Sequence, residues 1–410
     1  TDQKNVIYDI AKLVDEVTNQ LTLISVRYTQ DTRVEAYEKA QEASDEITPL
    51  FQELYNRYQK ALIASKFRSE LEKMLGSFLF KKIELSLQAF DPKIIGELQQ
   101  ENKLTSQYAK TLASAQIPFK GGVYNLSQMG KFLDEADRYT RKKASQAIAG
   151  WFGEHEEELA KIYDDLVHLR HQMARKLGFD NFIPLGYARM GRTDYSPLDV
   201  KSYRDQVYKA VVPLSKKLVR RQAERIGIKK PLFYDLSLNF ATGNPTPKGD
   251  KDYLVGVAAE MYAEMSPDIG AFFKLMVERH MLDLESRPGK QGGGYMTYFP
   301  KYKIPFVFSN FNGTSGDIDV LTHEIGHAFQ GYSSRHIKLP EYRDPTMEEA
   351  EIHSMSMEFF AWPWMERFFD EDKDKYLYAH LVSTINFLPY GVTVDEFQHF
   401  VYENPDSGHA

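Results

Sequence analysis

Apolar residues recur at helical spacing from the start of the chain to about residue 230, with few glycines or prolines between them. Side chains three and four positions apart lie on one face of an α-helix, so this spacing builds helices with a buried side. No long stretch alternates between polar and apolar residues, as a half-buried strand would. This region is therefore predicted to be helical, which limits the fold to a mainly α-helical class.

The clearest of these predicted helices ends at Gly178. Its apolar stripe consists of Leu159, Ile162, Leu166, Leu169, Met173 and Leu177. Three glutamates precede the stripe, and Arg175, Lys176 and Gly178 close it. Acidic residues at the start, basic residues at the end and a glycine just beyond are the signals of one complete helix.

The composition is typical of a globular protein with a large core, because 42% of the 410 residues are hydrophobic and 27% are charged. The 51 basic and 58 acidic residues are mixed along the chain, so no nucleic-acid partner is expected. The polar start, Thr1 to Lys4, resembles neither a signal peptide nor a membrane anchor, which favours a cytoplasmic location. There is no cysteine, so any metal must bind histidine and carboxylate side chains.

The pattern changes in the region before residue 317. Residues 295–299 and 304–308 are short aromatic and β-branched runs, and they are the only two segments that predict strands. A turn with two glycines, residues 312–316, follows them. The next helix is expected to begin near Asp317, whose side chain can cap it.

Residues His323-Glu324-Ile325-Gly326-His327 form an H-E-x-x-H motif in this helix. Residues four apart lie on the same helix face, so both imidazoles can reach one ion, and neutral imidazole suits Zn²⁺. Glu324 lies one step round the helix, where it can act as a general base on a water at the metal. A glycine inside a helix costs about 1 kcal/mol relative to alanine, and close packing of Gly326 against another backbone would explain it. The alternative is an accidental or vestigial match in a non-catalytic helical binding protein.

A catalytic zinc needs a third protein ligand. Gln330 and Ser333 stand where a metzincin would have glycine and histidine, which excludes that subclass. A carboxylate from a second helix remains, and a capping box at residues 346–349 starts one. This helix offers Glu348, Glu349, Glu351 and Glu358. Spacing alone does not choose among them, although Glu351 is favoured because it lies beyond the first turn.

Two further acids are predicted to support the metal ligands. Glu358 lies two turns beyond Glu351 on the same face and can accept a hydrogen bond from a ligand imidazole. Asp319, four residues before His323, can do the same.

Several sequence blocks resemble peptidase family M3, specifically its oligoendopeptidase F branch in the clan of thimet oligopeptidase. These blocks are Gly186 to Tyr195, Asn310 to His327, Ala350 to Glu358, and Asn386 to Asp395. The resemblance implies a multi-helix body around a deep substrate channel, with a small β-sheet beside the zinc helix. It also implies one Zn²⁺ per chain, with Glu351 as the third ligand.

The implied function is a zinc-dependent endopeptidase that hydrolyses short unstructured oligopeptides, because a narrow channel admits unfolded peptides only. The strand before the turn is implied to pair with the substrate backbone. This gives binding roles to the strand Tyr295 to Phe299, in particular Tyr298, and to the turn residues Gly313, Thr314 and Ser315. A zinc dipeptidyl carboxypeptidase is the related alternative, and the oligomeric state is left open.

The chain is expected to divide into an N-terminal helical region, residues 1–150, and a catalytic region, residues 151–410. Members of the family continue beyond the point where this sequence stops. The resemblance therefore implies that a C-terminal segment rich in His and Tyr, which stabilises the oxyanion, is missing.

Overall fold

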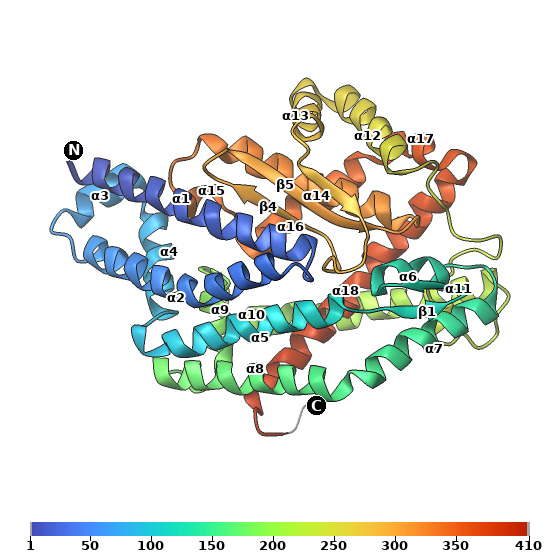
Figure 1. The fold of residues 1–410 in the computed structure, drawn as a ribbon, viewed down its shortest axis with the longest axis horizontal. Coiled ribbons are helices and arrows are strands. Elements are labelled where there is room, and N and C mark those ends of the chain that lie inside the picture. Colours follow the sequence, from blue (N-terminus) through green and yellow to red (C-terminus); the bar gives the residue numbers. More distant parts are fainter. Residues whose placement is uncertain (1, 408–410) are drawn as a thin grey trace.

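The computed structural model describes residues 2–407, and it is a largely helical molecule with two small sheets (Figure 1). The helices of the first half are α1 (Asp2–Gln30), α2 (Glu35–Ile63), α3 (Arg68–Leu75), α4 (Ser77–Gln88), α5 (Ile95–Ala113), α6 (Leu126–Leu133), α7 (Arg138–Glu154), α8 (Glu156–Leu177), α9 (Phe182–Arg189), α10 (Pro197–Gln206) and α11 (Val212–Arg225). Those of the second half are α12 (Lys251–Met265), α13 (Pro267–Glu278), α14 (Gly316–Ser333), α15 (Pro340–Arg343), α16 (Met347–Phe360), α17 (Met365–Phe369) and α18 (Lys373–Glu403). The strands are β1 (Ile117–Phe119), β2 (Gly122–Tyr124), β3 (Leu282–Glu285), β4 (Tyr295–Phe299) and β5 (Ile304–Phe311). The predicted mainly α-helical fold with a small β-sheet is confirmed.

Helix α8 has the ends that its sequence predicts. Three glutamates occupy its first turn, where they favour the helix dipole, and Arg175 and Lys176 occupy its last turn. Gly178 follows in the left-handed conformation with φ of 91°, which only glycine adopts without strain.

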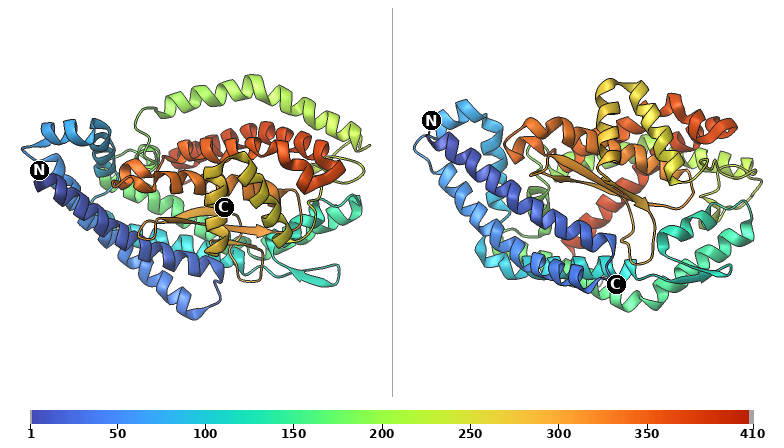
Figure 2. Two further views of the ribbon diagram at one scale, coloured as in Figure 1. Left: turned by 90° about the horizontal axis from the view of Figure 1, so that it is seen from above. Right: turned by 45° about the horizontal axis from the view of Figure 1, so that its top comes forward.

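The first helices form a layer beneath the sheet. Helices α1, α2, α5 and α8 pack each against the next, and α1 also contacts β4 (Figures 1 and 2). The loop after α1 is tied to the segment before β4, because the Thr32 backbone N–H and hydroxyl both donate to the Gly289 carbonyl, at 2.8 and 2.9 Å. The N-terminal helices are therefore held directly against the region of the H-E-x-x-H motif.

The larger sheet has the strand order β3-β5-β4, with β5 parallel to β3 and antiparallel to β4. The two strands predicted at residues 295–299 and 304–308 are present, and β5 extends three residues further. The expectation of only two strands is wrong, because β1, β2 and β3 are also present. Each of them is short and pairs with another strand. The strand directly before the turn is β5, and it cannot pair with a substrate because both its edges are occupied. Within residues 2–407, the unpaired edge next to α14 belongs to β4.

The two faces of this sheet pack against different helices. Phe306 and Phe308 point towards α1, where they contact Val26. Val307, one position between them, joins Ile325 of α14 in the largest hydrophobic cluster. This alternation follows from the pleat of the strand, and it places the sheet between α1 and the motif helix.

The predicted boundary between residues 150 and 151 lies inside α7 (Arg138–Glu154). In the part of the chain that the structure describes, no helix is both long and apolar enough to span a membrane.

A buried ion pair ties α7 to the segment after α11. Asp235 is fully buried and accepts hydrogen bonds from Arg138 at 2.8 Å and Arg141 at 3.0 Å. The Arg138 guanidinium, helped by Arg141, lowers the pKa of Asp235 to about 2, below its ordinary value. The unfolded chain therefore binds more protons than the folded chain at acidic pH, so the pair stabilises the fold above about pH 4 and loses this contribution as the pH falls towards 2.

Replacement of Asp235 by asparagine is expected to lower the free energy of unfolding at pH 7 by about 3 kcal/mol, because Arg141 stays buried without its counter-ion. Urea denaturation at pH 7 and pH 3 measures the loss, which should be smaller at pH 3. The control is Asp180→Asn, since that carboxylate is fully exposed. An equal loss at both pH values would contradict the ionic origin.

Candidate metal centre

Helix α14, which carries the motif, begins at Gly316 and has Ser315 at its N-cap position. The expectation that Asp317 caps this helix is wrong. Asp317 lies in the first turn, and its carboxylate accepts hydrogen bonds from the backbone N–H groups of Asn312 at 2.9 Å and Gly313 at 2.8 Å. These N–H groups belong to the preceding turn, so Asp317 fixes the approach of β5 to the helix.

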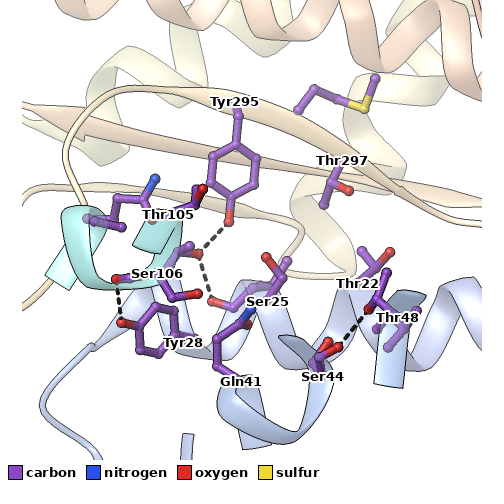
Figure 3. Close-up of a pocket in the computed structure, with 16 residues that line it drawn as sticks. Thr22, Ser25, Tyr28, Gln41, Ser44, Thr48, Thr105, Ser106, Tyr295 and Thr297 are labelled. Carbon is purple, nitrogen blue, oxygen red and sulfur yellow. Dashed lines mark hydrogen bonds between the residues drawn. The ribbon is translucent and has the colours of Figure 1, made fainter. Parts of the chain in front are cut away.

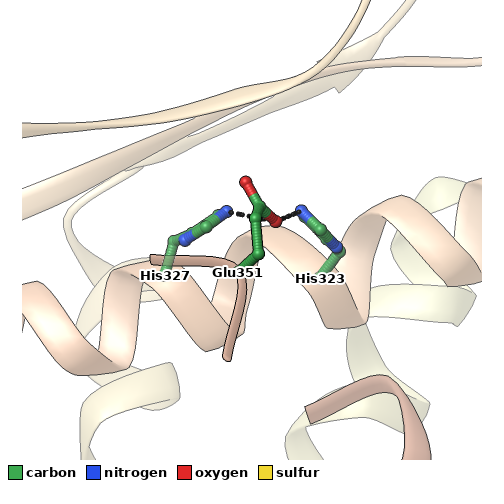
Figure 4. Close-up of side chains that lie close together, drawn as sticks. All are labelled: His323, His327 and Glu351. Atoms are coloured by element: carbon green, nitrogen blue, oxygen red, sulfur yellow. Dashed lines mark ion pairs between the residues drawn. The ribbon is translucent and has the colours of Figure 1, made fainter. Parts of the chain in front are cut away.

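The two motif histidines face one carboxylate from α16 (Figure 4). The Glu351 Oε2 atom lies 3.2 Å from His323 Nε2 and 3.7 Å from His327 Nε2. One potential ligand atom from each residue lies within 4.8 Å of the other two. The structure therefore brings together His323, His327 and Glu351, and among the predicted glutamates it is Glu351 that faces both imidazoles.

The donor set fits Zn²⁺. Metal–ligand distances near 2.0 Å in a tetrahedron separate ligand atoms by about 3.3 Å, and the separations between Glu351 and the two imidazoles lie close to that value. Two imidazoles and a carboxylate are also ligands that zinc accepts, and three protein ligands leave a fourth position open. His323, His327 and Glu351 would hold the ion.

Close packing between α14 and α16 sets this geometry. A Cβ atom added to Gly326 would lie 2.7 Å from the His353 carbonyl oxygen and 2.7 Å from Ser354 Cα. Both atoms belong to the α16 backbone, so only glycine lets the two helices approach this closely. The predicted packing of Gly326 against another backbone is confirmed.

Replacement of Gly326 by alanine is expected to lower the free energy of unfolding by about 1–3 kcal/mol, because overpacking outweighs the better helix propensity of alanine. The matched control is Gly331→Ala in the same helix, where the added Cβ would lie 3.5 Å from the Tyr298 ring, an ordinary contact. Chemical denaturation of both variants measures the difference. Equal stability of the two variants would contradict the packing argument.

Glu324 lies beside the metal ligands and is almost fully buried. The backbone N–H of Met296 in β4 donates to its carboxylate, and its Oε2 atom has no hydrogen-bond partner among the described residues. Burial raises the pKa of Glu324 to about 7, and the Glu351 carboxylate adds to the effect while His323 opposes it. A buried, unpartnered carboxylate oxygen beside three side chains that could hold a metal is suited to accept a proton.

Glu358 lies behind His323. Its Oε1 atom is 2.7 Å from His323 Nδ1, and its Oε2 atom is 2.7 Å from His380 Nε2. Although burial alone would raise the pKa of Glu358, the hydrogen bonds from the two histidines lower it. The contact occupies Nδ1 of His323 and leaves Nε2 to face Glu351.

His380 is a residue of this site that the sequence did not predict. Its ring is buried, contacts Glu358, and receives a hydrogen bond from the Trp362 indole at 3.1 Å. It lies 53 residues after His327 on α18, so no local spacing connects it to the motif.

The other predicted residues lie apart from the cluster. Asp319 accepts a hydrogen bond from the Tyr376 hydroxyl at 2.6 Å rather than from a ligand imidazole, because it points towards α18. The Tyr298 ring lies near Gly331 and the Arg343 guanidinium.

The turn residues are also separate from the metal ligands. The Thr314 hydroxyl and backbone N–H both bind the Asn312 side chain, at 2.8 and 3.1 Å. Ser315 precedes His323 by eight residues, which corresponds to about 12 Å along the helix axis. Gly313, Thr314 and Ser315 therefore lie at the far end of the helix from the histidines.

Fold and site together define a class of helical proteins built around an H-E-x-x-H helix, with a carboxylate ligand supplied by the following helix. Family models give the finer assignment. The Peptidase M3 N-terminal domain matches residues 1–90, and Peptidase family M3 matches residues 259–410.

Individual relatives agree with this assignment. The chain is 21% identical to an oligoendopeptidase F homolog of Lactococcus lactis subsp. lactis (strain IL1403), over 86% of this chain and 61% of the relative. It superposes on PZ peptidase A, crystallised with an inhibitor, with a TM-score of 0.98 and 51% identity, over 99% of this chain and 72% of that one. A protein from Bacillus anthracis str. Ames, assigned as an oligoendopeptidase F, gives a TM-score of 0.97 and 51% identity, over 99% and 74%.

The chain therefore belongs to peptidase family M3, in the oligoendopeptidase F branch. It spans 61% of the length of the curated Lactococcus relative that it matches.

Proposed function

We propose that this chain carries the catalytic centre of a zinc-dependent endopeptidase that hydrolyses short, unstructured oligopeptides. The observation that carries the proposal is the convergence of His323, His327 and Glu351 beside the unpartnered Glu324 carboxylate. A bound Zn²⁺ would polarise the scissile carbonyl and lower the pKa of a water molecule at the open position.

Glu324 is the general base of the proposed reaction. Its free Oε2 atom takes the proton of the attacking water, and the protonated carboxyl then donates that proton to the departing amine. The Met296 N–H holds the side chain in place during both transfers.

Glu358 is the positioning residue for His323. Its carboxylate accepts a hydrogen bond from the Nδ1–H group, which directs the lone pair of Nε2 towards the ligand cluster. His380 and Trp362 in turn hold Glu358 from the far side.

The substrate backbone is proposed to align along the free edge of β4. Met296 and Tyr298 are two residues apart, so their backbone groups point to the same edge, and the Met296 N–H already faces Glu324. A peptide added there would pass directly in front of the metal ligands. The Gly313 to Ser315 turn remains a candidate for contacts with one end of the peptide.

Metal analysis combined with a quenched fluorescent peptide tests the function. We expect one Zn²⁺ per chain, cleavage that a chelator abolishes and zinc restores, and cleavage of a peptide with an amidated C-terminus. Cleavage that requires a free C-terminus would support the dipeptidyl carboxypeptidase instead. A chain that binds zinc without any cleavage would indicate a binding protein with a vestigial motif.

A further inference from the structure

A cavity of about 560 Å³ lies on the α1 side of β4, bounded also by α2 and α5 (Figure 3). Tyr295 and Thr297 of β4 enter it from above, and Thr22 and Ser25 of α1 line it from below. The metal-binding helix α14 packs on the opposite face of the sheet. This cavity is therefore distinct from the ligand cluster but shares β4 with it.

The pleat of β4 connects the cavity to the reaction. A peptide that pairs with the free edge continues the sheet, so its successive side chains point alternately to the α14 face and to the α1 face. Tyr295 and Thr297 point to the α1 face, so substrate side chains in register with them enter the cavity. The volume accommodates a side chain of any natural size.

The side chains that line the cavity are uncharged. Its 16 residues are mostly Ser, Thr, Gln and Tyr, and none of the 16 carries a charge. The neighbouring Asp45 is buried, and both its carboxylate oxygens are occupied, by the Gln41 amide at 2.8 Å and the Ser106 hydroxyl at 2.8 Å. A carboxylate side chain would therefore lose its hydration in the cavity without gaining a counter-ion, and the charged group beside it would be the like-charged Asp45.

Gln41 supplies a hydrogen-bond acceptor that is not used. Its amide nitrogen donates to Asp45, which fixes the orientation of the group. Its Oε1 atom is buried and has no partner in residues 2–407. Neighbouring atoms cover this oxygen, so a side chain that donates a hydrogen bond reaches it when the Gln41 amide shifts towards the cavity that it lines.

We propose that this cavity is a substrate subsite that selects a hydrogen-bond-donating side chain over an anionic one in the peptide aligned on β4. The proposal rests on the function proposed above, since it needs a peptide at the β4 edge. Glutamine is the best probe of the subsite, because glutamate and methionine have nearly the same shape but lack the neutral donor.

Binding to the metal-free chain tests the subsite without turnover. The probes are labelled short alanine-glycine peptides with one Gln, Glu or Met moved through each position, measured by fluorescence anisotropy. At one position, or at positions two apart, we expect the Gln peptide to bind about 10-fold more tightly than the Glu peptide, with Met between them. Equal binding of the three peptides at every position, or none, would overturn the proposal.

Two variants place the effect in the cavity. Thr48→Lys adds a cation to the lining and is expected to reverse the preference in favour of the Glu peptide. Gln41→Leu removes the acceptor and is expected to abolish the preference for Gln over Met. Leu54→Lys adds the same charge to an exposed site on the same helix and should leave the wild-type order unchanged.

Thermal unfolding of each variant establishes that it is folded. Because Gln41→Leu adds no charge to the cavity, this variant provides a second test if Thr48→Lys does not fold. The outcomes separate the two proposals. If Thr48→Lys reverses the peptide preference but the zinc-loaded chain cleaves no peptide, the subsite proposal stands and the proposed peptidase function fails. If the zinc-loaded chain cleaves peptides but Thr48→Lys and Leu54→Lys have identical preferences, the proposed function stands and the subsite proposal fails.

Discussion

Replacement of Glu324 by glutamine is expected to lower kcat by about 10²–10⁴-fold, the contribution of a positioned general base. Glutamine keeps the size of the side chain and still offers an oxygen to the Met296 N–H, so the local structure should persist. It cannot take up the proton of the attacking water. Glu324 is not one of the three side chains that converge, so zinc content should not change.

Two measurements on the same preparation decide this prediction. Peptide hydrolysis gives kcat, and elemental analysis gives zinc per chain. The matched control is Glu349→Gln on α16, because a glutamine at that position can also accept the hydrogen bond from the Thr346 N–H. Full activity in Glu324→Gln would contradict the role of Glu324 as general base. Loss of zinc would instead indicate that Glu324 maintains the geometry of the site.

Local signals predicted the elements that carry the site. The helical spacing, the strands at β4 and β5 and the glycine at position 326 depend on residues close together in the sequence, and each is present. The capping pattern before α16 also works as predicted, since the Thr346 N–H binds the Glu349 carboxylate at 3.1 Å.

The errors concern pairing between distant segments. Strand β3 is four residues long and alternates Leu with acids, and its parallel pairing with β5 and the burial of Leu284 hold it in place. The sequence around β5 also does not reveal that β3 and β4 occupy both of its edges. The sequence therefore did not show which of the strands keeps a free edge.

The same limit applies within the site. The spacing of residues on α16 left four glutamates open as third ligand, and the crossing of α14 and α16 at Gly326 determines which of them faces the imidazoles. His380 reaches Glu358 only because α18 packs behind α16. Asp319 turns towards Tyr376 for the same reason, although its spacing from His323 matches a support role.

Replacement of Glu351 by alanine is expected to weaken zinc binding by more than the roughly 10–100-fold that loss of a supporting hydrogen bond costs. Glu351 faces both Nε2 atoms, and its removal leaves two imidazoles, fewer than the three protein ligands of a catalytic zinc site. Glu358→Ala removes the hydrogen bonds to His323 Nδ1 and His380 Nε2 but none of the three converging side chains, so its zinc affinity should lie between that of Glu351→Ala and the wild type.

Competition with a chelator of known affinity measures this order. Glu348→Ala is the matched control, because that carboxylate lies one turn before Glu351 on the same helix and pairs with Arg192 at 2.5 Å. Its zinc affinity should equal that of the wild type. Unchanged zinc affinity in Glu351→Ala together with a loss in Glu348→Ala would show that a different carboxylate completes the site. The metal would then lie elsewhere relative to β4, and the proposed alignment of the substrate along this strand would have to be revised.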